Sequence, residues 1–172
     1  TACGGVTYVK CQYQLISDNL LDLTHETYIH RSSLGNQAVV EHPITTKGDA
    51  QKVVVQRLIP DHEPAPFWKA NLFRKLGKHV NADRWQIIHF EAPANVVLDV
   101  GVTPAGHPRA DGVEGCNTNA ITPETEDSTW YFWGFARKFS RDDEALSGKL
   151  VETIAKIFEE DREACEAVHA VM

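Results

Sequence analysis

Four runs in the second half of the chain have the residue character of β-strands, with apolar and aromatic residues interspersed with polar ones. They cover 85–91, 95–103, 113–123 and 128–139. Such runs between turn signals are typical of strands. The proline- and glycine-rich stretch 104–108 separates the second run from the third. This pattern predicts four strands.

The first half of the chain contains three further candidate strands. Residues 9–15 alternate between apolar and polar residues, the period of two that is typical of a strand that buries one face. The stretches 37–42 and 52–59 also have the character of strands. Pro43 and a turn signal at 47–49 join the last two. We therefore predict seven strands in all.

Two helices are predicted before the long run of strands. The first begins at Ser17, whose hydroxyl can cap a helix, and continues to about residue 33, before Gly35. The second is short and covers 67–76, between Pro66 and Gly77.

A long helix is predicted at the C-terminal end, from about 142 to 171, with Ser140 and Asp143 as its capping pair. Asp161 falls on its apolar stripe, where a carboxylate must be paired, protonated or bound to a cation. An ion pair with Lys or Arg at the rim of the stripe and a metal ligand both stay open. The apolar positions, three and four apart, are Leu146, Leu150, Ile154, Ile157, Cys165 and Val168.

Seven strands with few helices between them predict an antiparallel sheet with its helices on one side, which is an α+β fold. A chain of 172 residues is long enough to bury a core without disulfides, and we expect one domain, 1–172.

Composition and charge narrow the classes of partner. The formal net charge of −7 argues against nucleic acid and against an anionic membrane surface. No apolar run approaches the roughly 20 residues of a membrane-spanning helix. Four cysteines without a recurring spacing indicate a reducing compartment, so we expect a cytoplasmic location.

The stretch 19–30 carries the candidate chemistry. His25 and His30 lie five residues apart, and Asp22 precedes His25 by three. Two imidazoles with a carboxylate from elsewhere form the ligand set of non-haem Fe(II) oxygenases, and Asp22 is placed to orient His25. Positions five apart differ by about 140° around a helix, so a shared metal requires a bend or bulge. Two solvated histidines are the alternative.

Three separated stretches, 13–31, 122–133 and 158–167, resemble the Rieske-type oxygenases, in particular the vanillate O-demethylase and dicamba demethylase oxygenase group. The resemblance implies that His25, His30 and Asp161 bind mononuclear iron. It further implies that Asp22 passes electrons to His25 and that Asn19 lies near the metal without binding it.

The same resemblance implies a helix-grip (START-like) sheet curled around the C-terminal helix. It implies homotrimers that receive electrons from a ferredoxin or reductase and use O2 to oxidise a small aromatic substrate. In the nearest group the substrate is an aryl methyl ether, which yields a phenol and formaldehyde.

The [2Fe-2S] Rieske cluster of such a system needs Cys-x-His and Cys-x-x-His. None of the four cysteines, Cys3, Cys11, Cys116 and Cys165, has a histidine at these offsets. We therefore expect the cluster on a domain outside this chain, upstream of it in the family.

Candidate substrate contacts come from the predicted strands. His89 lies between apolar neighbours, Asn95 and Asn117 are polar residues on strands, and Trp130 belongs to an aromatic run. A role at a strand end or in solvent is the alternative for each. Ordinary surface or capping roles are expected for His42, His62, His79, His107 and His169.

Two other classes of function stay open at this point. A metal-free carrier would use the cavity of a curled sheet for a hydrophobic ligand. A hydrolase would use the same three ligands to hold zinc with an activated water.

Overall fold

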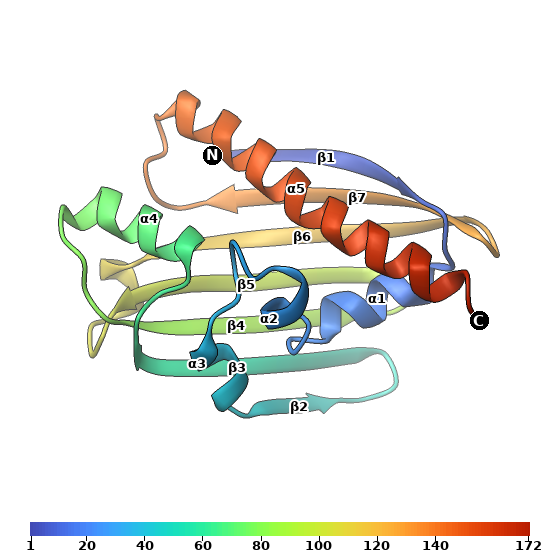
Figure 1. The fold of residues 1–172 in the computed structure, drawn as a ribbon, viewed down its shortest axis with the longest axis horizontal. Helices are drawn as coiled ribbons and strands as arrows, with labels where there is room; N and C mark the ends of the chain where they lie inside the picture. The colour runs from blue at the N-terminus through green and yellow to red at the C-terminus, as the bar shows by residue number, and fades with distance from the viewer.

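The computed structural model describes all 172 residues, and it contains one antiparallel sheet of seven strands. The strands lie in the order β1-β7-β6-β5-β4-β3-β2, so β2 to β7 form a meander and β1 is added beside β7 (Figure 1). Their bounds are β1 Ala2–Val9, β2 Ile44–Gly48, β3 Lys52–His62, β4 Ala82–Glu91, β5 Asn95–Pro104, β6 Val113–Thr125 and β7 Ser128–Arg137.

Five α-helices cover one face of this sheet, and the long α5 crosses it diagonally (Figure 1). The helices are α1 Tyr13–Leu21, α2 Glu26–Ile29, α3 Gln37–Glu41, α4 Pro66–Leu76 and α5 Glu144–His169, with a short 3-10 helix at Arg109–Asp111. This confirms the predicted α+β fold, a helix-grip sheet with the C-terminal helix lying across it. No helix has both the length and the apolar character needed to cross a membrane.

Helix α5 forms because one face is apolar and its first turn is capped. The Asp143 carboxylate accepts a hydrogen bond of 2.8 Å from the backbone N–H of Leu146. The predicted cap at Ser140 is therefore wrong by three residues, since Ser140 has a positive φ of 43° and lies outside the helix. Asp161 is buried together with the apolar stripe.

The predicted strands at 9–15 and 37–42 are wrong. Residues from Tyr13 onward form α1, which buries Ile16 and Leu20, four apart, and the strand lies earlier as β1. The stretch 37–42 is the short helix α3, because Asn36 caps it through the N–H of Val39. The seventh strand, β2, occupies the stretch that was predicted as a connection.

The predicted helix from 17 to 33 is interrupted. It begins earlier than Ser17, ends at Leu21, and a second helix of four residues, α2, starts at Glu26. The Asp22 carboxylate accepts hydrogen bonds from the N–H and hydroxyl of Thr24, a local turn that competes with the helix.

Candidate metal centre

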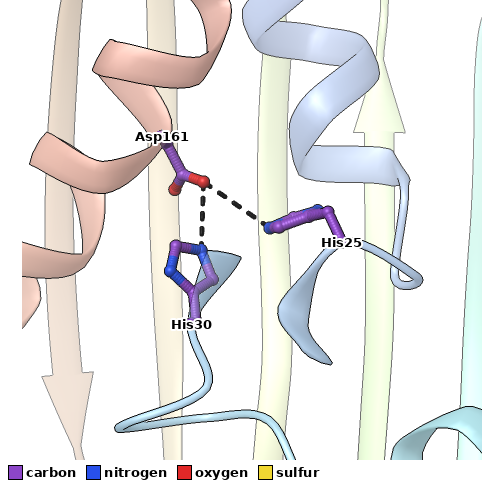
Figure 2. A group of neighbouring side chains, drawn as sticks. All are labelled: His25, His30 and Asp161. Atoms are coloured by element: carbon purple, nitrogen blue, oxygen red, sulfur yellow. Dashed lines mark ion pairs between the residues drawn. The ribbon is translucent and has the colours of Figure 1, made fainter. Parts of the chain in front are cut away.

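Two imidazoles and one carboxylate converge on a single point between α2 and α5 (Figure 2). Asp161 Oδ1 lies 3.0 Å from His30 Nε2 and 3.5 Å from His25 Nε2. The three candidate ligand atoms all lie within 4.8 Å of one another. The structure therefore brings together the three residues that were predicted as iron ligands.

The two histidines converge from the two ends of the short helix α2. His25 is the residue that precedes α2, and His30 is the residue that follows it. Their ring centroids are 5.0 Å apart and the ring planes make an angle of 77°. The backbone from His25 to Ile29 is helical and leaves the helix at His30, with φ −103° and ψ 37°, so the departure from helical geometry that the five-residue spacing requires lies at His30 itself.

The site is largely shielded from water. His30 is 1% exposed and Asp161 is 7% exposed. Burial by itself lowers the pKa of His30, but the Asp161 and Glu160 carboxylates outweigh it, and the net effect is a raised pKa. Although both Nε2 atoms face Asp161 Oδ1, this buried oxygen has no partner with hydrogen-bond geometry. Lone pairs that point to one shared centre fit a bound cation, so the residues present fit a metal ion.

A carboxylate contacts the far side of one of the two candidate ligand histidines, and it belongs to Glu160. Its Oε2 lies 2.8 Å from His30 Nδ1 and so directs Nε2 towards Asp161. This role of Glu160 was not predicted from the sequence, because Glu160 belongs to an acidic run typical of a solvated helix face. Its position immediately before the buried Asp161 was the available signal.

The carboxylate of Asp22 was predicted to orient His25, and it does not. The backbone carbonyl of Asp22 contacts His25 Nδ1, while its carboxylate is exposed and binds Thr24. The helix ends at Leu21, so the helical geometry behind the prediction is absent. Asn19 is half-buried and shares a narrow crevice with Asp161 and Tyr131.

A cavity of about 90 Å³ lies between the sheet and helices α4 and α5. Glu26, which follows His25 in the sequence, is part of its wall, and Phe158 lines both this cavity and the crevice beside Asp161. The other lining residues are Leu34, Phe67, Trp68, Arg84, Gln86, Leu98, Val100, Asn117, Phe135, Ile154 and Ile157.

One of the four predicted substrate contacts reaches this cavity. Asn117 lines it and is 7% exposed. His89, Asn95 and Trp130 are exposed, because they alternate with the inward residues of their strands and so point to the opposite face. On that face Trp130 packs against Tyr8 with the two rings tilted by 57°, and its indole N–H approaches Glu124.

The remaining histidines take mostly local roles, as expected. His42 contacts the backbone carbonyl of Ala38, and His107 and His169 lie beside aspartates. His62 is the exception because it is buried, at 7% exposure, against the prediction of a surface role.

A buried polar cluster on β4 was not predicted. Arg84 Nη2 lies 3.0 Å from Glu26 Oε2, and the Gln86 amide N–H donates to Glu26 Oε1. The signal in the sequence was the alternation itself, since Arg84 and Gln86 share a face with the apolar Ile88.

Comparison with known proteins agrees with this geometry. The family model described as the vanillate O-demethylase oxygenase C-terminal domain matches residues 9–172. A vanillate O-demethylase oxygenase subunit from a Pseudomonas species is 40% identical over 169 residues, which cover 95% of this chain and 51% of that protein. The chain thus spans about half the length of the curated relatives it matches.

Solved structures give the same result for the fold. A structure of dicamba monooxygenase bound to 3,6-dichlorosalicylic acid has a TM-score of 0.90 at 29% identity, over 98% of this chain and 49% of that one. A second structure, of dicamba monooxygenase with non-haem iron and dicamba, has a TM-score of 0.73 at 29% identity, over 98% and 47%.

Proposed function

Because the chain belongs to the family of vanillate O-demethylase oxygenase C-terminal domains, the catalytic domains of Rieske-type oxygenases, we propose that it binds mononuclear Fe(II) and oxidises a small aromatic substrate with O2. The reaction we propose is O-demethylation of an aryl methyl ether to a phenol and formaldehyde. The observation that carries the proposal is the convergence of His25, His30 and Asp161 on one point.

Each residue of the centre has a distinct part in this function. His25 and His30 would bind the metal through Nε2, and Asp161 through Oδ1, the oxygen that lies close to both rings. Glu160 would hold His30 in the coordinating orientation through Nδ1. A bound Fe(II) would supply the open coordination positions at which dioxygen reacts, as in other centres of two histidines and one carboxylate.

The cavity beside the centre is the proposed substrate site. Its wall is mainly apolar, as a site for an aromatic ring requires, and three of its residues have a buried polar atom without a partner, namely Trp68 Nε1, Gln86 Oε1 and Asn117 Oδ1. A ligand with polar substituents would satisfy them. Benzene occupies an engineered cavity of about 150 Å³, so this 90 Å³ cavity would have to widen to admit even a single aromatic ring.

The hydrogen bond of Gln86 to Glu26 determines whether its side chain can act as a donor or an acceptor for a substrate. Its amide N–H is committed to the Glu26 carboxylate, which can only accept, so the group that this cavity-lining residue has left to offer is the acceptor Oε1, which has no partner in the protein. A substrate hydroxyl would meet this requirement. Asn117, on β6, has no such commitment and could bind either kind of substituent.

The electron path is proposed to enter at Asp22. This residue is exposed, and its carbonyl contacts the His25 ring, so it links the surface to a ligand of the metal. In the proposed homotrimer a neighbouring subunit would present its [2Fe-2S] Rieske cluster here, reduced by a ferredoxin or reductase, with Asn19 near the metal as a non-ligand. Loss of Asp22 should then slow electron delivery without loss of iron.

Iron content tests the metal centre directly. We expect the chain to bind one Fe(II) under anaerobic conditions, and Asp161→Ala to lose it. Glu163→Ala is the matched control, since Glu163 is an exposed carboxylate on the same helix. Full iron occupancy in the Asp161 variant would contradict the assignment.

The other two classes of function predict different results in the same preparation. A hydrophobic-ligand carrier would bind apolar probes equally well with and without iron. A zinc hydrolase would turn over substrate without O2 and without a reductant. The proposed oxygenase requires iron, O2 and electrons together.

A further inference from the structure

The segment 23–34, here called the ligand segment, carries both histidines of the proposed centre but has little structure of its own. Its one helix, α2, has four residues, too few to be stable without tertiary contacts. The relative position of His25 and His30 must therefore be set by contacts from outside the segment.

We propose that two buried arginines of the sheet, Arg57 and Arg84, are positioning residues that fix the separation of His25 and His30 by holding the ligand segment at both ends. The inference rests on the proposed metal-binding function, and it adds a role for side chains that do not touch the metal.

Arg57 holds the first end. It lies on β3, is 2% exposed, and its Nη1 donates a hydrogen bond of 2.8 Å to the backbone carbonyl of Leu23. Leu23 is two residues before His25. This bond fixes the chain where it enters the ligand segment, directly after the break that follows α1.

Arg84 holds the other end and the middle. It lies on β4, is 3% exposed, and its Nη1 donates to the carbonyl of Leu34 over 3.0 Å. Its Nη2 lies 3.0 Å from the carboxylate of Glu26, the residue next to His25. One guanidinium group thus binds the start of α2 and the chain beyond His30 together.

The anchors themselves are rigidly spaced. In the pairing of β3 with β4, Arg57 lies opposite Gln86, which also donates to Glu26, and Arg84 lies opposite Ile59. Both strands lie inside the sheet, with neighbours on either side. The positions of Leu23, Glu26 and Leu34 are therefore all fixed relative to the same sheet.

Stabilisation of the core alone does not explain the cluster of Arg57, Arg84 and Glu26, because the burial of charged groups costs desolvation free energy. Of the two buried guanidinium groups only that of Arg84 pairs with a carboxylate, that of Glu26, and apolar residues of similar volume often stabilise a core as well or better. Its geometric consequence is specific, because each bond ends on the ligand segment.

The two arginines make a distinguishable prediction. Arg57 donates one bond to this segment, which a lysine can replace, whereas Arg84 serves two partners in different directions, which the compact ammonium group of lysine cannot do. We therefore expect Arg57→Met to weaken metal binding and Arg57→Lys to bind the metal as the wild type does. Arg84→Lys should weaken metal binding, although it keeps the positive charge.

The experiment measures anaerobic Fe(II) affinity by competition with a chelator, and the visible spectrum of the Co(II)-loaded protein as a report of ligand geometry. We expect a loss in affinity of roughly 10-fold to 100-fold for Arg57→Met and Arg84→Lys, typical when a group that orients a ligand is removed. Their Co(II) spectra should change as well.

Arg137→Lys is the matched control. Arg137 is equally buried, at 3% exposed, and binds the Asp143 carbonyl and the Ser147 hydroxyl, but it touches no part of the ligand segment. It should retain the wild-type affinity and spectrum even if it unfolds at a lower temperature. Equal losses in Arg84→Lys and Arg137→Lys would show a general effect of instability and overturn the inference.

A second variant keeps the test decisive if Arg84→Lys does not fold. Glu26→Met has a similar length and volume, and its thioether offers no oxygen to accept from Arg84 or Gln86. We expect lower affinity and an altered Co(II) spectrum, and wild-type values in this variant would overturn the inference. If the wild-type chain binds neither ion, the proposed function itself fails, and this inference fails with it.

Discussion

At the scale of single residues, the centre depends on two adjacent carboxylates with different tasks. Successive residues on a helix point about 100° apart, so Asp161 faces inward while Glu160 lies closer to the surface of α5. Asp161 offers an oxygen to both imidazoles, and Glu160 contacts the far side of one of them. Neither residue can replace the other.

Replacement of Glu160 should therefore weaken the metal site without removing a ligand. We expect Glu160→Ala to lower Fe(II) affinity by about 10-fold, because His30 Nδ1 loses its acceptor. Glu160→Gln should be closer to wild type, since an amide oxygen still accepts from the ring. Glu159→Ala serves as the control in a chelator competition, and a similar loss there would point to net charge rather than orientation.

His62 should make the protein less stable in acid. Burial and the nearby Arg84 lower the pKa of His62 below its ordinary value. Below a pH of about 6.5 the unfolded chain takes up a proton at this residue that the folded protein does not, so the folded state loses stability as the pH falls.

Thermal unfolding at pH 7.5 and 5.5 checks this expectation. The decrease in melting temperature between the two conditions should be smaller for His62→Leu than for wild type. His30, whose shift has the opposite sign, is present in both proteins and cancels in the comparison. An equal decrease in both would contradict the assigned pKa shift.

The residues of the centre show what could be predicted at this scale. Asp161 could be singled out from the sequence because it interrupts an apolar stripe. The histidines could be singled out because of their residue type and spacing. The roles of Glu160 and Glu26 could not be predicted from the sequence, since an acidic side chain on a helix is normally solvated. Their roles depend on which segment of the chain packs beside them.

At the scale of elements, the longer strands and helices were predicted well and the shorter ones were not. β4 to β7 and α5 have many periods of their pattern, so the period is unambiguous. Residues 9–15 and 37–42 are short, and the capping by Asn36 and the four-residue spacing of Ile16 and Leu20 override the apparent alternation. Short apolar runs do not distinguish strand from helix by period alone.

Two glycines allow the packing of these elements to be tested. A Cβ at Gly5 on β1 would lie 2.5 Å from Cζ2 of Trp133, an aromatic ring that packs on Phe158 of α5. We expect Gly5→Ala to destabilise the fold by about 1–3 kcal/mol, the usual cost of overpacking. Gly148 on α5 has open space around its Cβ position, so Gly148→Ala should stabilise by about 0.5–1 kcal/mol.

Urea denaturation of both variants measures these changes. The opposite signs are the informative result, because both substitutions add the same single carbon. If Gly5→Ala were neutral, Trp133 would have room to move and the contact between β1 and the rest of the core would be looser than the structure indicates.

At the scale of the whole molecule, the proposed centre joins parts of the chain that are distant in sequence. Asp161 is separated from His30 by 131 residues, and the whole meander of β2 to β7 lies between them. The sheet aligns the two ends, because the ligand segment and α5 cover the same face (Figure 1). The patterns of the separate elements do not place Asp161 beside the two histidines, and the expectation that they meet came from the resemblance of three separated stretches to one family.

A metal that binds across this junction should stabilise the entire fold. A ligand that binds the folded state at 100 times its dissociation constant adds about 2.7 kcal/mol to the free energy of unfolding. We therefore expect anaerobic Fe(II) to raise the melting temperature of the wild-type chain, and to leave that of Asp161→Ala unchanged. Scanning calorimetry with and without the metal measures both. The same rise in both proteins would mean that the ion binds elsewhere, because without Asp161 no ligand on α5 connects the two distant segments.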